Sequence, residues 1–111
     1  MRLMTTLIVA LACVPAAADE YPLEIETDLK AEYFVVEKDG TPQQPTLLLK
    51  RVRAGSTSYS KRLFDCEARA SKYLGSGETL EEVAASKPDE EMTPVAPGTI
   101  AEQLWKHACG K

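Results

Sequence analysis

The sequence is poor in the residues from which most catalytic and metal sites are built. Its 111 residues include one histidine, His107, and three cysteines, with no Cys-x-x-Cys pair. A zinc site needs three or four ligands, so His107 and Cys109 do not make one by themselves. Glycine-rich phosphate loops and serine-nucleophile motifs are also absent from the sequence. These absences predict a protein that is not an enzyme and that uses no metal or cofactor.

Acidic residues are plentiful, but they do not form a recognisable site. The clusters at 81–82 (EE) and 89–91 (DEE) lack the alternating oxygen ligands of a calcium loop. They also lack the apolar neighbours that are typical of a catalytic carboxyl pair. We interpret both clusters as solvated helix and loop surfaces.

Long hydrophobic runs are absent outside the segment MRLMTTLIVALACVPAAA at 1–18. This segment has a positive charge at Arg2, an apolar run over 7–14, a helix-breaking Pro15 and three alanines at 16–18. That order is typical of a secretory signal peptide, and the apolar run is shorter than the roughly 20 residues of a transmembrane helix. The pattern predicts a cleaved signal peptide and no transmembrane segment.

The predicted cleavage leaves a single domain over 19–111, exported to the periplasm or the outer-membrane surface of a Gram-negative bacterium. A lipoprotein signal, in which Cys13 carries the lipid, is the alternative. Either way, only Cys66 and Cys109 remain, so one disulfide is possible and an oxidising compartment would form it. The bridge closes a loop of about 44 residues, for which loop-closure entropy gives up to about 4 kcal/mol of stabilisation.

Charge is segregated along the chain. The segments 19–39 and 65–91 each contain eight acids, whereas 40–64 contains five bases and no acid. Those five bases are Lys50, Arg51, Arg53, Lys61 and Arg62. They predict a binding site for an anionic partner, such as phosphate, sulfate or a carboxylate-bearing glycan, with neutralisation by the acidic flanks as the alternative. The net charge of −4 argues against nucleic acid as the partner.

Alternating apolar residues and β-branched runs predict a sheet. The predicted strands cover 21–28, 31–37, 46–53 and a segment from Tyr59 onward, with a loop at 38–45 and a turn at 54–58. If that turn is a five-residue hairpin loop, Arg51 lies opposite Lys61, and Arg62 lies on the other face. Two like charges would then need an anion or an acidic neighbour between them. The segment 66–74 fits a helix or a strand, and Gly75 and Gly77 are expected to end it.

Two helices have clear start signals. In the segments 79–86 and 99–109, a threonine is followed three residues later by a glutamate, which is the capping-box pattern. Gly110 lies where a left-handed C-cap is needed. The second helix has an apolar side made of Ile100, Ala101, Leu104, Trp105 and Ala108. We therefore predict an α+β fold, in which an antiparallel sheet of four or more strands is covered by the C-terminal helix and braced by one disulfide.

The second half of the chain, residues 57–111, resembles the surface-adhesin protein E family of small exported bacterial proteins. The resemblance rests on Asp65-Cys66 within YSKRLFDCEARASKYL and on PGTIAEQLWKHAC at 97–109. It implies an antiparallel sheet, a terminal helix disulfide-bonded to a strand, a tendency to form homodimers, and a relationship to an outer-membrane adhesin that captures host proteins. The segment 75–92 departs from the family, because a short acidic helix and loop replace a further hairpin.

Together these features predict an exported, non-enzymatic binding protein of the bacterial envelope, adhesin-like, whose partner is a host or envelope macromolecule. A small periplasmic inhibitor of a basic hydrolase such as lysozyme is the alternative, in which the acidic segments attract the partner. A third hypothesis, from a different class, is an envelope enzyme or metal carrier.

Overall fold

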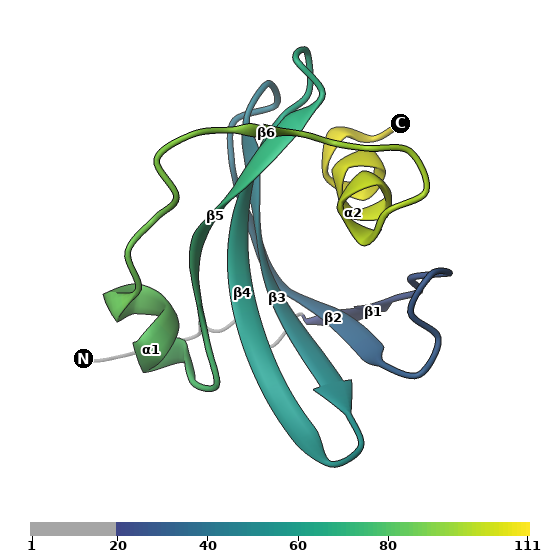
Figure 1. Cartoon of the computed structure of the whole chain (residues 1–111), viewed down its shortest axis with the longest axis vertical. Coiled ribbons are helices and arrows are strands. Elements are labelled where there is room, and N and C mark those ends of the chain that lie inside the picture. Colours follow the sequence, from purple (N-terminus) through teal and green to yellow (C-terminus); the bar gives the residue numbers. More distant parts are fainter. Residues whose placement is uncertain (1–19) are drawn as a thin grey trace, which may run out of the picture.

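The computed structural model describes residues 20–111. The predicted signal peptide and Cys13 lie outside the described residues. The chain forms one six-stranded antiparallel sheet in which each strand pairs with the next along the sequence (Figure 1). The strands are β1 (Tyr21–Leu23), β2 (Glu32–Gly40), β3 (Pro45–Arg53), β4 (Ser56–Asp65), β5 (Ala70–Gly77) and β6 (Thr93–Pro94). The sheet is therefore a meander, and three of its five connections contain four residues or fewer, which antiparallel strands allow.

Two helices complete the fold, α1 (Leu80–Ala85) and α2 (Ile100–Cys109). Their predicted N-caps are confirmed, because the hydroxyls of Thr79 and Thr99 accept the backbone N–H three residues later. Gly110 ends α2 in the left-handed conformation, with φ of 70°. No helix within residues 20–111 is long and apolar enough to span a membrane.

The hydrophobic core lies between the sheet and α2. Along β3, alternate residues point to one face, where Leu47 and Leu49 are buried. From the helix, Leu104, Trp105 and Ala108 belong to the same buried cluster. Its other members are Ile25, Tyr33, Val35, Phe64 and Val95. We call the sheet face that carries Leu47 and Leu49 the α2 face.

Helix α1 packs on the opposite face and edge of the sheet, against β5 and β4 (Figure 1). Gly75 makes this approach possible, because a Cβ there would lie 2.3 Å from the Val83 carbonyl oxygen. The expectation that these glycines end their segment is wrong for Gly75, which lies inside β5, whereas Gly77 is the last residue of the strand. Both make room for the helix.

The predicted disulfide is present and joins Cys66 to Cys109, with the two Cα atoms 5.6 Å apart. Cys66 lies in the turn between β4 and β5, where Asp65 Oδ1 accepts the N–H groups of Glu67 and Ala68. The segment 66–74 is neither one helix nor one strand, because this turn precedes β5. A disulfide fits an exported protein, since oxidising compartments keep such bonds.

The strand boundaries and one register differ from the prediction. β1 ends at Leu23 rather than near residue 28, and β2 and β3 extend into the predicted loop at 38–45. The β3–β4 turn consists of two residues, Ala54 and Gly55, both with positive φ, rather than five. That two-residue turn fits the twist of a hairpin. Arg51 consequently pairs with Ser58 and not with Lys61.

Candidate functional site

The α2 face is only partly occupied by the helix. Figure 1 shows α2 nearly end-on while β3 and β4 run down the picture, so the helix crosses the strands. A helix is about 10–12 Å wide, whereas the ten residues of β4 span about 33 Å. The part of the α2 face beyond the helix carries polar side chains and forms a cleft of about 520 Å³. This volume falls within the usual range of ligand pockets.

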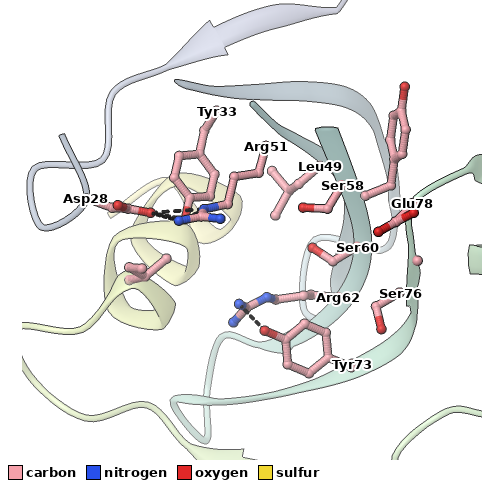
Figure 2. A pocket seen from close by; sticks show the side chains of 13 residues that line it. Asp28, Tyr33, Leu49, Arg51, Ser58, Ser60, Arg62, Tyr73, Ser76 and Glu78 are labelled. Atoms are coloured by element: carbon pink, nitrogen blue, oxygen red, sulfur yellow. Dashed lines mark hydrogen bonds and ion pairs between the residues drawn. The ribbon is translucent and has the colours of Figure 1, made fainter. Parts of the chain in front are cut away.

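The cleft is lined mainly by polar and charged side chains from β2, β3, β4, β5 and the loop before β2 (Figure 2). Their side chains include those of Asp28, Tyr33, Arg51, Ser58, Ser60, Arg62, Tyr73, Ser76 and Glu78. Leu49 and Ile100 contribute apolar surface. The register of β3 and β4 explains the gathering, because Arg51 pairs with Ser58 and Leu49 with Ser60, so that these side chains share one face.

Arg62 is the least satisfied charged residue of the cleft. Its Nη2 donates to the Tyr73 hydroxyl at 2.6 Å, and its guanidinium carbon lies 4.3 Å from the centre of that ring. The Arg62 Nε–H is buried and has no hydrogen-bond partner among the residues that the structure describes. A buried N–H without a partner costs about 1–3 kcal/mol. Arg62 is thus held in place and retains unused capacity to donate.

Arg51, in contrast, already has partners. Its Nε donates to Asp28 Oδ2 at 3.0 Å and to the Tyr33 hydroxyl at 3.1 Å, and Nη2 forms an ion pair with Asp28 at 3.0 Å. The Tyr33 hydroxyl also donates to Asp28, at 2.8 Å. The hydrogen bond from Tyr33 and that from Arg51 lower the pKa of Asp28. Burial, and then the neighbouring carboxylate, raise the pKa of Tyr33.

Asp28 is positioned by a loop that is tied to α2. The side chain of Gln103 accepts from the Glu26 backbone N–H at 2.7 Å and donates to the Thr27 hydroxyl at 2.8 Å. Ile25 anchors the same loop because it is 3% exposed within the core. The loop therefore holds Asp28 at one rim of the cleft.

The five predicted basic residues are divided by the fold. Arg51 and Arg62 lie in the cleft, and Arg53 is exposed at the end of β3. By alternation along their strands, Lys50 and Lys61 belong to the opposite face. Lys50 there pairs with Glu20 at 2.8 Å and lies 4.8 Å from the centre of the Phe34 ring. Two of the five, Lys50 with Glu20 and Arg51 with Asp28, thus have the neutralisation by an acidic flank that was the alternative.

Most of the other cleft residues were not predicted as site residues. Tyr33 was assigned to a strand without a role, Tyr73 lay in the segment that fits a helix or a strand, and Asp28 was one acid among many. The Ala54-Gly55 turn is the sequence feature from which the serines could have been predicted to line the cleft. With a two-residue loop, the alternation of β4 places Ser58, Ser60 and Arg62 on the face of Arg51.

His107 makes a contact between elements of the fold. Within residues 20–111, no group of three or more histidine, cysteine or acidic side chains is arranged to hold a metal ion. His107 Nε2 and the Tyr21 hydroxyl are hydrogen-bonded at 2.7 Å, which ties β1 to α2. Burial, and then the charge of Lys38, lower the pKa of His107.

The Asp28 contacts predict a specific pH dependence of stability. Because the folded-state pKa of Asp28 is lowered, its carboxylate stabilises the fold above its unfolded pKa of about 3.9. That contribution is lost as the pH falls through the lower, folded value. We expect the urea midpoint of wild type to fall more steeply on acidification than that of Asp28→Asn. Glu90→Gln, at an exposed position, should retain the wild-type slope, and parallel curves for all three proteins would contradict this assignment.

Comparison of the chain with protein-family models, with curated proteins and with solved structures finds no match.

Proposed function

We propose that the protein is an exported, non-enzymatic binding protein of the bacterial envelope, adhesin-like, and that the cleft takes an anionic group of its macromolecular partner. The observation that carries the proposal is the Arg62 guanidinium, which faces the cleft with a buried N–H that lacks a partner within residues 20–111. The guanidinium is therefore not fully paired, and a ligand oxyanion in the cleft can accept from its terminal N–H groups. Hydrogen bonds of this kind are among the strongest in proteins, and arginine can form two of them to one carboxylate or phosphate.

The position of Arg62 also favours binding. Tyr73 fixes the guanidinium through a hydrogen bond and through its ring, so little side-chain freedom is lost when a ligand arrives. Tyr73 itself is 40% exposed. A partner can therefore reach the pair without any movement of α2.

The framework supports the remaining parts of the proposal. The disulfide is consistent with the periplasm or the outer-membrane surface. The resemblance to the surface-adhesin E family implies an antiparallel sheet with a terminal helix disulfide-bonded to a strand. The six-stranded antiparallel sheet and the Cys66–Cys109 bond are consistent with this arrangement. On this proposal the family's tendency to form homodimers also applies.

The test compares two neighbouring charges on opposite faces. Arg62→Ala is expected to weaken capture of the partner from an outer-membrane extract roughly tenfold to hundredfold, which corresponds to the loss of a charge-assisted hydrogen bond. Lys61→Ala removes an equal charge from the other face and should leave capture unchanged. Quantitative mass spectrometry of the captured proteins and glycans gives the readout.

Two outcomes would contradict the proposal. If both variants capture as well as wild type, the cleft is not the binding site. If capture is instead lost when the exposed acids Glu81 and Glu90 are neutralised, the acidic surface binds the partner. The protein would then fit the small inhibitor of a basic hydrolase, which inhibition of lysozyme would measure directly.

A further inference from the structure

We propose that the ligand of the cleft is a carboxylate-bearing saccharide, whose carboxylate binds Arg62 and whose hydroxyl groups bind the serines and Glu78. This inference rests on the proposed function, because it assumes that the cleft binds an anion. It adds the chemical class of the ligand, which the positive charge of the cleft does not determine.

The cleft contains two arginines, of which one is available to a ligand. Arg51 is already engaged by Asp28 and Tyr33. Arg62 has no acidic partner among residues 20–111 and keeps an unpaired N–H. The cleft therefore has room for one negative group at Arg62 and not for a strongly charged polyanion.

An acidic side chain lies at the end of the cleft away from Arg62. Glu78 also lines the cleft, and Figure 2 shows it near Ser58, with Ser60 between Ser58 and Arg62. Glu78 is exposed, and because a carboxylate accepts hydrogen bonds, its side chain favours a ligand that donates. Sulfate has no proton to donate and would be repelled. A sugar hydroxyl donates readily, and a saccharide can present such hydroxyls several ångströms from its carboxylate.

Three serine hydroxyls lie between Arg62 and Glu78. No side-chain hydrogen bond within the described residues uses Ser58, Ser60 or Ser76, although all three line the cleft. Ser58 and Ser60 are two residues apart on β4, or about 6.6 Å. Ser60 and Ser76 are direct partners across β4 and β5. Each serine hydroxyl both donates and accepts, as do the hydroxyls of a sugar.

The shape and the apolar surface of the cleft agree with this ligand. The volume of about 520 Å³ is larger than one inorganic anion requires. Ile100 of α2 is half-buried and lines the cleft, so the C–H face of a sugar ring can pack against it. Tyr73 lies beside Arg62 at one end of the polar row, and Tyr33 lies beside Arg51 (Figure 2).

Calorimetric titration of the whole exported chain tests the inference with defined probes. The acidic probes are D-galacturonate and N-acetylneuraminate, the neutral probe is D-galactose, and the inorganic probes are sodium sulfate and sodium phosphate. We expect both acidic sugars to bind at least tenfold more tightly than galactose and than either inorganic anion. Arg62→Ala should reduce the affinity for the acidic sugars at least tenfold, and Lys61→Ala should leave it within twofold.

Glu78→Gln separates the ligand classes by the sign of its effect. Removing this charge removes an acceptor for sugar hydroxyls, so we expect acidic sugars to bind at least threefold more weakly. The same change removes a repulsion, so any sulfate binding should strengthen. Matching urea midpoints of Glu78→Gln and wild type will establish that the variant is folded.

The outcomes distinguish this inference from the proposed function. If sulfate or phosphate binds as tightly as the acidic sugars and depends on Arg62, the cleft is a general anion site and the saccharide inference is wrong, while the proposed function stands. If neither acidic sugar binds, the inference is overturned. If anions bind and Arg62→Ala leaves all affinities unchanged, the proposed function fails together with it.

Discussion

Replacing Trp105 with alanine is expected to lower the free energy of unfolding by about 3–5 kcal/mol, the usual cost of removing a buried aromatic ring. Trp105 is 4% exposed and belongs to the core cluster between α2 and the sheet. Its Nε1–H donates to the Asp65 carbonyl at 3.0 Å, and the Arg69 guanidinium lies 4.7 Å from the ring centre. The loss is large because a domain of this size has a total stability of about 5–15 kcal/mol.

Two matched variants identify the origin of that loss. Trp105→Phe keeps an aromatic ring and loses only the indole donor to the Asp65 carbonyl, which still accepts from the Arg69 N–H at 2.9 Å, so it should cost less than Trp105→Ala. Leu80→Ala removes a side chain that is 48% exposed, and its effect should stay within about 0.5 kcal/mol. Urea denaturation followed by far-UV circular dichroism measures all three. A Trp105→Ala effect as small as that of Leu80→Ala would show that Trp105 does not support the core.

The helices were predictable because their signals are local. Thr79 and Thr99 precede their helices directly, and Gly110 follows α2 at once. A capping box satisfies backbone N–H groups within a few residues, so its sequence pattern needs no knowledge of the rest of the chain. The disulfide was predictable for a different reason, since two cysteines in an exported domain have one possible pairing.

The strand register was not predictable from the same kind of pattern. Ala54 has φ of 50°, a conformation that alanine rarely adopts, and the turn lacks the Asn-Gly or Asp-Gly pair that usually marks a two-residue hairpin. The five-residue loop shifts the pairing by three positions. An odd shift places each side chain of β4 on the wrong face. The prediction therefore separated Arg51 from Arg62, which share the cleft.

The cleft itself depends on tertiary contacts that no short pattern encodes. Asp28 reaches Arg51 because Gln103 of α2 holds the loop before β2. Tyr73 lies opposite Arg62 on the neighbouring strand because of a register shift between Lys61 and Arg62. The charge pattern pointed to the stretch that supplies both arginines of the cleft. It could not distinguish the arginine that is already paired from the one that remains available.

Replacing both Cys66 and Cys109 with alanine is expected to lower the free energy of unfolding by up to about 4 kcal/mol. The bond joins residues 43 apart in sequence, and most of its effect should come from restricting the unfolded chain rather than from native contacts. The measurement is the urea midpoint of the double variant beside that of wild type, with and without reductant. Reductant should lower the wild-type midpoint to that of the double variant and leave the variant unchanged. Equal midpoints for wild type and variant without reductant would contradict the prediction.

A double-mutant cycle with Trp105→Phe separates the two ways in which the bond can act. If the disulfide stabilises only by restricting the unfolded chain, its loss and the Trp105→Phe loss should add within about 0.5 kcal/mol. If it also holds α2 against the sheet, the two changes affect one interface, because Cys109 is the last residue of that helix. We expect near-additivity, since Leu104, Trp105 and Ala108 are buried against the sheet in their own right. A coupling above about 1 kcal/mol would instead assign the bond a direct role in docking α2, and hence in setting the wall of the cleft to which Ile100 contributes.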